Sequence, residues 1–292
     1  MPVTITSLHS YPVKSCAGLT HRNAAITAAG LERDRHWVIV DQYGIFMTQR
    51  TYPRMALVRP ALDAGGNLTL SAPGMPAVTV PAPLRAPSDA IQAVPVRIWS
   101  ADTLGADEGD DVAHWLGEFL GTPSRLLREH PRARRVASPE HVNTWIDKHG
   151  DWADGFAQEH VFGFADGFPF LVTNQASLDE LNRQLQARGA DPIAMNRFRP
   201  NIVIDGLEPY DEDYLTGMRA GTLTFAFVKA CARCPIPNIN PETAAVGQEP
   251  GLTLAANRMF PEGMLFGVNA VVDGAAQAVL QVGDEIEPEF YF

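Results

Sequence analysis

The sequence predicts an α+β fold, mostly β, in which helices are inserted between strands. Short segments rich in β-branched residues recur along the chain and are separated by glycine and proline, as in meanders and barrels. Helical patterns occur between them without the regular strand–helix alternation of a doubly wound sheet. No glycine-rich phosphate loop follows a predicted strand, which weakens a nucleotide-binding interpretation.

The strand-like segments are clearest in the first hundred residues. They are residues 3–6, 37–40, 67–70 and 78–80. Residues 81–95 contain four prolines and little pattern, so they predict a loop or an edge. Later strands are expected at residues 170–173, 201–204 and 222–228, and the last alternates poorly, as a strand buried on both faces does.

Two helices are expected. The first covers residues 110–120, with acidic residues at its start and Gly121 at its end. Its apolar face consists of Val112, Trp115, Leu116 and Phe119. The second starts near Ser177, because Ser177 and Glu180 form a capping-box pattern, and it stops at Gly189. Its apolar positions are Leu178, Leu181 and Leu185.

Composition and charge exclude several classes of function. The 292 residues are 46% hydrophobic, which is ordinary for a globular protein. With 23 basic and 34 acidic residues the net charge is −11, so no nucleic-acid surface is expected. Neither a secretory signal nor an apolar run of the ~18 residues needed to span a membrane is present. The three cysteines are too few for a disulfide framework, which favours a reducing compartment. We therefore expect a cytoplasmic protein, and, from the lack of a spanning segment, no membrane contacts.

Cys231 and Cys234 form a Cys-x-x-Cys pair directly after the long apolar strand. A thioredoxin-like pair would need a helix after the first cysteine, which the prolines of the following segment oppose. A structural zinc site would need histidines to complete about four ligands, and the histidines lack metal-ligand spacing. Buried thiols packing as small apolar groups are a further alternative.

Arg233 precedes Cys234 in the sequence, and a cation beside a cysteine favours the thiolate. A thiolate held at a strand end by an irregular turn is a suitable soft ligand for a larger metal cofactor.

Four segments together resemble the MOSC family, named for the C-terminal domain of molybdenum cofactor sulfurase. They are residues 11–18, 33–37, 197–204 and 231–234, in the family's order. The similar branch includes the mitochondrial amidoxime reducing component and its bacterial relatives. The resemblance implies an N-terminal β-barrel domain over residues 1–123 and a MOSC β-barrel domain with inserted helices over residues 124–292.

The resemblance also implies a molybdenum-molybdopterin cofactor, with Cys234 as the catalytic residue and metal ligand and Cys231 as a structural residue. The positions implied at the cofactor are Lys14, Ser15, Arg35, Asp166, Phe168 (through its backbone), Arg199, Ala232, Arg233 and Asn269. Arginine suits bidentate phosphate recognition and lysine suits point-charge recognition, so the basic members would bind the pterin phosphate.

The implied activity is two-electron reduction of N-hydroxylated compounds such as amidoximes, hydroxylamines or hydroxylated nucleobases. Electrons are expected from a separate ferredoxin, flavodoxin or cytochrome-type protein, because three cysteines cannot supply a metal ligand and a four-cysteine cluster as well. The alternatives are a persulfide sulfur-transfer protein that uses Cys234 and a non-enzymatic module with structural zinc.

A run of arginines stands out in this acidic chain. Its members are Arg125, Arg128, Arg132, Arg134 and Arg135. A solvated loop is the ordinary interpretation, and a docking patch for an acidic electron-transfer protein is the functional one.

Overall fold

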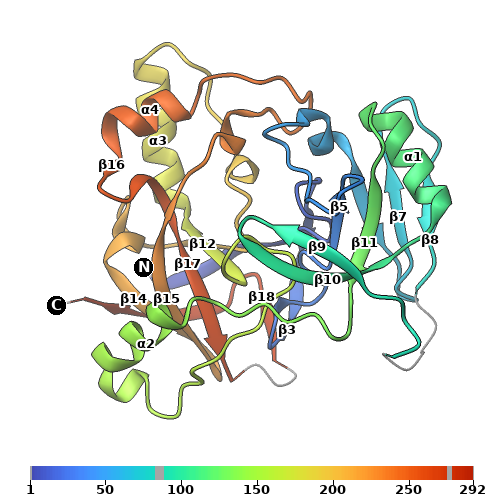
Figure 1. Ribbon diagram of the computed structural model, residues 1–292. Helices are drawn as coiled ribbons and strands as arrows, with labels where there is room; N and C mark the ends of the chain where they lie inside the picture. The colour runs from blue at the N-terminus through green and yellow to red at the C-terminus, as the bar shows by residue number, and fades with distance from the viewer. Residues whose placement is uncertain (1, 83–88, 275–277, 292) are drawn as a thin grey trace.

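The structure is a computed structural model that describes residues 2–82, 89–274 and 278–291. Seven strands form a closed barrel (Figure 1). Their order is β12 (Phe170–Asn174), β13 (Ile202–Asp205), β1 (Val3–Ser10), β19 (Glu285–Phe290), β14 (Leu215–Ala220), β15 (Leu223–Ala232) and β17 (Gly263–Asp273). Pairing of β17 with β12 closes the barrel, and β12 and β13 are its parallel pair. The predicted strand-dominated α+β class is confirmed.

Alternating apolar residues of these strands fill the barrel interior. Val3, Ile5 and Leu8 of β1 are buried at a spacing close to the two-residue period of a strand. Phe170 and Phe225 meet edge to face across the core, with ring centroids 5.2 Å apart. Burying a side chain of this size is worth ~1.5–3 kcal/mol.

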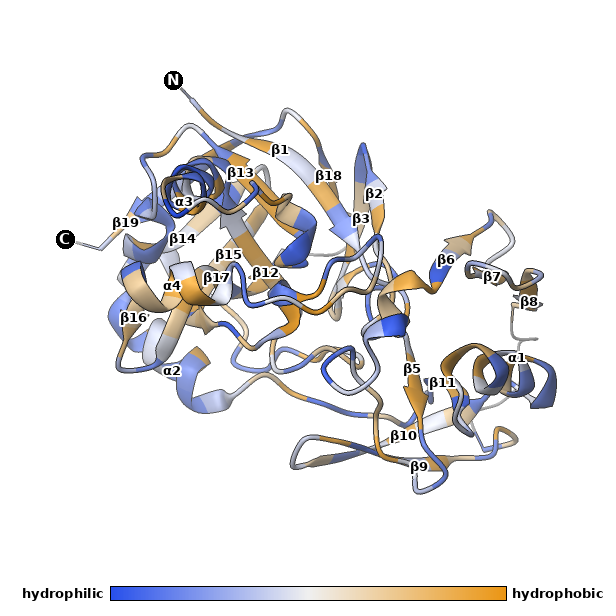
Figure 2. Cartoon of the chain, turned by 90° about the horizontal axis from the view of Figure 1, so that it is seen from above, coloured by the Kyte–Doolittle hydropathy of each residue, from blue (hydrophilic) through white to orange (hydrophobic). Residues whose placement is uncertain are grey.

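The remaining strands form smaller sheets and extensions. They are a four-stranded antiparallel sheet of β5 (Trp37–Val40), β11 (Arg125–Glu129), β10 (Ala101–Asp107) and β9 (Val94–Ile98); a sheet of β6 (Arg59–Leu62), β7 (Leu68–Ser71) and β8 (Val78–Val80); a sheet of β18 (Val279–Gln281), β3 (Asn23–Thr27) and β4 (Gly30–Leu31); and the short β2 (Leu19–His21) and β16 (Met259–Phe260). Viewed from above, the four-stranded sheet lies to one side of the barrel strands (Figure 2). The predicted irregular segment 81–95 includes residues 83–88, which lie outside the described residues.

Four α-helices occur in the described residues. They are α1 (Asp110–Leu120), α2 (Pro139–Lys148), α3 (Gln175–Ala187) and α4 (Gly251–Asn257), with single 3-10 turns at η1 (Pro53–Leu57), η2 (Gly150–Trp152), η3 (Met195–Arg197), η4 (Asp211–Tyr214) and η5 (Ile236–Asn238). Helix α1 covers residues 110–120 as predicted, and Gly121 ends it in the left-handed conformation with φ 72°. Helix α2 was not predicted, and it packs on β15 through the buried Val142 and Trp145.

Helix α3 is confirmed, but its predicted cap is wrong. The helix starts at Gln175, and the Asn174 side chain accepts a hydrogen bond from the amide of Ala176 at 3.2 Å. Ser177 lies in the first turn of the helix, and its hydroxyl donates to the Glu212 carboxylate at 2.6 Å. The capping-box pattern predicts that the Ser177 hydroxyl bonds to a backbone amide at the helix start. In the structure this hydroxyl bonds to a buried carboxyl group instead.

The two halves of the chain share strands. β1 lies in the barrel between β13 and β19, although it starts at Val3. β11 follows residue 123 and pairs with β5 and β10 of the smaller sheet. The domain limits of 1–123 and 124–292 stay a prediction.

Candidate functional site

The Cys-x-x-Cys pair lies where the barrel strand β15 ends. Cys231 is the second-last residue of β15, and Cys234 lies two residues beyond it in the turn that leads to η5. Both side chains are partly exposed, whereas Cys16 is fully buried. Cys234 is therefore accessible in an irregular turn, as the sequence predicts, and Cys231 belongs to the strand.

Arg233 contacts the other cysteine of the pair. One Nη donates to Cys231 Sγ at 3.0 Å, and the second donates to the Phe198 carbonyl at 2.7 Å. Arg233 precedes Cys234 in the sequence, but in the structure it is hydrogen-bonded to Cys231. The Nε atom of Arg233 is buried and has no partner in the described residues, so one donor of this guanidinium is free.

Arg35 and Arg199 lie over the same aromatic ring. Their guanidinium carbons are 4.4 and 4.2 Å from the centroid of the Tyr11 ring. Arg35 donates to Asp34 at 2.5 Å, and its second Nη reaches the Arg199 carbonyl at 3.4 Å. Burial raises the pKa of the Tyr11 hydroxyl to about 12, so the phenol stays protonated and donates to the Pro200 carbonyl.

The cluster of Arg35, Arg199 and Arg233 carries surplus positive charge. Asp34 is the carboxylate paired with it in the described residues. Burial and, to a lesser degree, the Arg35 charge lower the pKa of Arg199 to about 10. Half-buried cations with this surplus favour an anionic ligand.

Three predicted positions have left-handed backbone. The φ angles are 64° at Ser15, 47° at Arg35 and 57° at Arg199. Such conformations cost about 1–3 kcal/mol each in a non-glycine residue and persist where surrounding contacts hold them. Gln49 stabilises the conformation of Ser15 by donating to the Ser15 carbonyl at 2.8 Å. The conformation of Arg35 is stabilised by its backbone amide, which donates to the Tyr11 carbonyl at 2.9 Å. Strain of this kind is typical of functional sites.

Lys14 and Asp166 form an ion pair between distant segments. The Lys14 ammonium, 6% exposed, donates to Asp166 Oδ1 at 2.6 Å, while the Asp166 side chain is 69% exposed. Burial lowers the pKa of Lys14, and Asp166 opposes this. Crowding by protein atoms would raise the pKa of Asp166, but Lys14 outweighs it and holds that pKa below its usual range. The carboxylate is therefore ionised and accessible.

The remaining predicted positions lie on or beside the strands β15, β17 and β12. Ala232 ends β15 and pairs with Leu265, and Asn269 of β17 donates to the Lys229 carbonyl at 3.3 Å. Phe168 packs its side chain on the core beneath α2 and lies 6.0 Å from the His141 ring. Asn269 faces Leu171 across the sheet, and the Leu171 amide donates to Asn201, which also accepts from Arg35.

Several side chains at the site escaped sequence reasoning. They are Tyr11, Asp34, Trp99, Arg135 and Asn201. Arg135 donates to the carbonyls of Gly163, at 2.8 Å, and Ala165, at 2.5 Å, and so shapes the turn that carries Asp166. Tyr11, Asp34 and Asn201 lie within the four segments that resemble the MOSC family, but nothing in their spacing shows which of them are in contact.

Most arginines of the run are paired or buried. Arg125 pairs with Asp107 and Asp110, and Arg134 pairs with Glu159. Arg128 pairs with Glu108 at 3.4 Å. Carboxylates from elsewhere in the chain neutralise these three arginines and Arg135 is buried, whereas Arg132 is exposed and has no ion pair in the described residues. The docking interpretation of the run stays a prediction.

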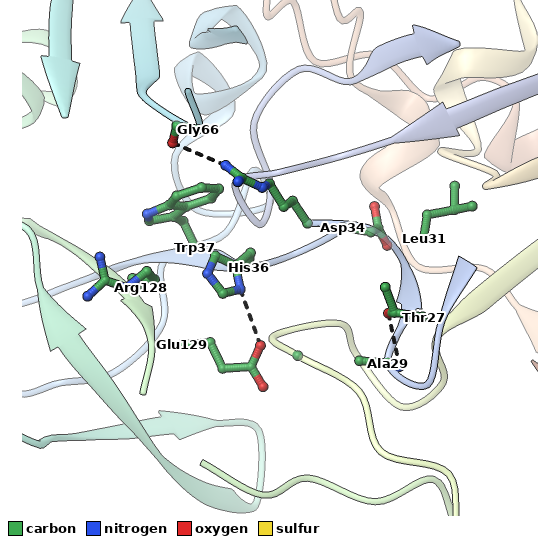
Figure 3. A pocket seen from close by; sticks show the side chains of 11 residues that line it. Thr27, Ala29, Leu31, Asp34, His36, Trp37, Gly66, Arg128 and Glu129 are labelled. Carbon is green, nitrogen blue, oxygen red and sulfur yellow. Dashed lines mark hydrogen bonds and ion pairs between the residues drawn. The ribbon is translucent and has the colours of Figure 1, made fainter. Parts of the chain in front are cut away.

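A cavity of about 250 Å³ adjoins the arginine cluster (Figure 3). In Figure 3 the His36 ring points toward Glu129, with Nδ1 3.4 Å from the carboxylate. Arg33 Nη1 donates to the Gly66 carbonyl at 3.1 Å. Asp34 lines this cavity and also binds Arg35 and the Tyr11 amide. The described residues contain no group of three or more His, Cys, Asp or Glu side chains arranged to hold a metal, so the zinc module lacks a ligand set there.

Comparison with known proteins assigns the family. Profiles of the MOSC N-terminal beta barrel domain and the MOSC domain match residues 2–123 and 159–287. The chain belongs to the MOSC family. This MOSC protein is 32% identical to mitochondrial amidoxime-reducing component 1 of Homo sapiens, over 97% of this chain and 82% of that protein. It is 28% identical to mitochondrial amidoxime reducing component 2 of Bos taurus, with the same two coverages of 97% and 82%.

The MOSC chain is also similar to a larger protein. It is 28% identical to molybdenum cofactor sulfurase of Danio rerio, over 98% of this chain and 34% of that protein. In the described residues no helix has the length and apolarity that crossing a membrane requires.

Proposed function

We propose that the protein is a molybdenum-cofactor-dependent reductase of N-hydroxylated compounds such as amidoximes, hydroxylamines and hydroxylated nucleobases. The observation that carries the proposal is the surplus positive charge of Arg35, Arg199 and Arg233, directly beside the turn that bears Cys234. Similarity to proteins named amidoxime-reducing components supports the reaction class.

The residues present fit an anionic pterin cofactor. The unpartnered Nε of Arg233 is a buried donor that a bound anion would satisfy. Arg35 and Arg199 would share the phosphate with it, since guanidinium groups bind phosphate through paired hydrogen bonds. Cys234 would supply the thiolate ligand to the metal. The other residues at the cofactor would be Lys14, Ser15, Asp166, Phe168, Ala232 and Asn269.

The cofactor, when bound, supplies the two-electron redox chemistry. The overall reaction consumes two electrons and two protons, breaks the N–O bond, leaves an N–H group and releases water. The chain binds the cofactor and the substrate and orients them. Its guanidinium groups compensate the negative charge of the cofactor, and the ionised, accessible Asp166 can accept a hydrogen bond from the amino group of an amidoxime.

Electrons would come from a separate ferredoxin, flavodoxin or cytochrome-type protein. With Cys234 as a metal ligand, only Cys16 and Cys231 remain, and an ordinary iron–sulfur cluster needs four thiolates. The sequence has no glycine fingerprint for a dinucleotide.

Metal analysis tests the proposal. The chain is produced in a host that makes the cofactor, and molybdenum and zinc are measured per chain. We expect about one molybdenum per chain, as one thiolate ligand implies. Zinc in its place would favour the structural module, and neither metal would leave persulfide transfer on Cys234. Either result overturns the proposal.

A further inference from the structure

Trp99 is an exposed aromatic residue in a strained turn. It lies between β9 and β10, its backbone φ is 56°, and 47% of the residue is exposed. Its indole Nε1 donates to Asp166 Oδ1 at 2.8 Å, and the Phe46 ring packs against it with centroids 4.8 Å apart. A large apolar side chain kept exposed in a costly conformation indicates a function other than packing.

Arg50 lies over the Trp99 ring. Its guanidinium carbon is 4.1 Å from the ring centroid, and its Nε makes a long hydrogen bond of 3.4 Å to Thr48 Oγ1. No carboxylate of the described residues pairs with Arg50, whereas the neighbouring Arg97 is bonded to Asp102. The ring therefore holds Arg50 in place and leaves both Nη atoms free to donate.

This pair lies beside the candidate cofactor residues but apart from the arginine cluster. Asp166 Oδ1 accepts from Trp99 and from Lys14, so one carboxylate joins the indole to the site. Arg50 is partly exposed, and none of its contacts involves Arg35, Arg199 or Arg233. Asp166 and Arg50 therefore contact the same indole ring, and both side chains are at least partly exposed.

We propose that Arg50, supported by Trp99, binds an oxyanion of the substrate and selects N-hydroxylated compounds that carry a carboxylate or phosphate. A fixed guanidinium binds such groups through two parallel hydrogen bonds. The inference rests on the proposed function, which supplies the N-hydroxylated part of the substrate. In a chain of net charge −11, an unpaired cation at this position offsets the repulsion that an anionic substrate meets.

Binding without turnover tests the proposal. The oxidised, cofactor-loaded protein is titrated by calorimetry, with no reductant present, with benzamidoxime and 4-carboxybenzamidoxime, and with N6-hydroxyadenosine and its 5′-monophosphate. We expect the anionic member of at least one pair to bind about tenfold more tightly, as one charge-assisted contact implies. The pair with the larger preference identifies carboxylate or phosphate.

The variants isolate the guanidinium. Arg50→Gln should remove the preference and change the Kd of the neutral compounds less than about twofold, because neutral ligands make no ion pair. Trp99→Leu should reduce the preference, because it removes the ring on which Arg50 lies. Arg54→Gln is the matched control, since Arg54 also lies over an aromatic ring, that of Phe119 at 4.4 Å. Arg54→Gln should keep the full preference.

Three outcomes would overturn the role of Arg50: no preference in the wild type, an unchanged preference in Arg50→Gln, or loss of molybdenum from Arg50→Gln. The last would place Arg50 at the cofactor. Turnover of neutral benzamidoxime with a chemical reductant is measured in parallel. Its absence contradicts the reductase, while turnover with no binding preference contradicts the role of Arg50 alone.

Discussion

Arg199 donates a hydrogen bond of 2.5 Å to the carbonyl of Cys16, a residue 183 positions earlier in the chain. This contact fixes the segment that carries Lys14 and Ser15 against the segment that carries Arg199. Two of the sequence motifs thus meet through a side chain and a backbone group.

Arg199→Ala should lower molybdenum content about tenfold, because a charge-assisted bond to phosphate is worth ~1.5–3 kcal/mol. The apo protein should lose little stability, since removing Arg199 also relieves its repulsion with Arg35. Metal analysis and thermal melts of apo protein check both parts. Arg219→Ala is the control, because Arg219 lies over the Trp152 ring at 4.0 Å. A large loss of apo stability would show a structural role instead.

Cys234→Ser should abolish reduction of benzamidoxime, lowering kcat at least about a hundredfold, since a hydroxyl is a poor soft ligand. Cys231→Ser should keep activity within about tenfold, because a serine oxygen can still accept the Arg233 hydrogen bond. Steady-state rates with a chemical reductant measure both variants. Equal losses in the two would refute the assignment of different roles.

Glu212→Gln should flatten the pH dependence of stability. Burial raises the pKa of Glu212 to about 7, so the folded chain keeps a proton that the unfolded chain releases near its ordinary value of 4.5. The wild type therefore loses stability as the pH rises between these values, by up to ~3 kcal/mol, and levels off above pH 7. Melting temperatures at pH 5 and pH 8 measure this. The exposed Glu208→Gln should behave like the wild type, and the prediction fails if Glu212→Gln does too.

The purified chain should not reduce benzamidoxime with NADH alone. A reduced ferredoxin, flavodoxin or cytochrome should support turnover, because the electrons must cross a transient protein interface. NADH oxidation followed by absorbance, with and without the added protein, is the measurement. Efficient turnover with NADH alone would rule out the separate donor.

The sequence predicts those elements that depend on local patterns of residues. The strand that ends at the cysteine pair and the apolar face of α1 follow from periodicity and glycine placement. Helix α2 was missed because its buried apolar residues are only Val142 and Trp145, too few for a clear helical face.

Contacts across long sequence distances escaped prediction. Asn201 accepts from Arg35 across 166 positions, and no spacing rule links them. The arginine run was read as a possible patch because the sequence does not show which distant carboxylates pair with it, such as Glu159 with Arg134. The cytoplasmic location stays a prediction.

The pairing of β1 with β19 governs how the protein can be made in a cell. Val3 of β1 pairs with Ile286 of β19, so β1 lacks this partner strand until β19 has been synthesised. Until then the backbone edge of β1 stays open to pairing with other chains, an aggregation hazard during translation. Pairing of two strands this far apart in the sequence is also slow, because the long chain between them must first be brought together. Because Lys14 follows β1 and Cys234 follows β15, the two parts of the site can meet only after β15 has been synthesised, so no cofactor can be inserted before then.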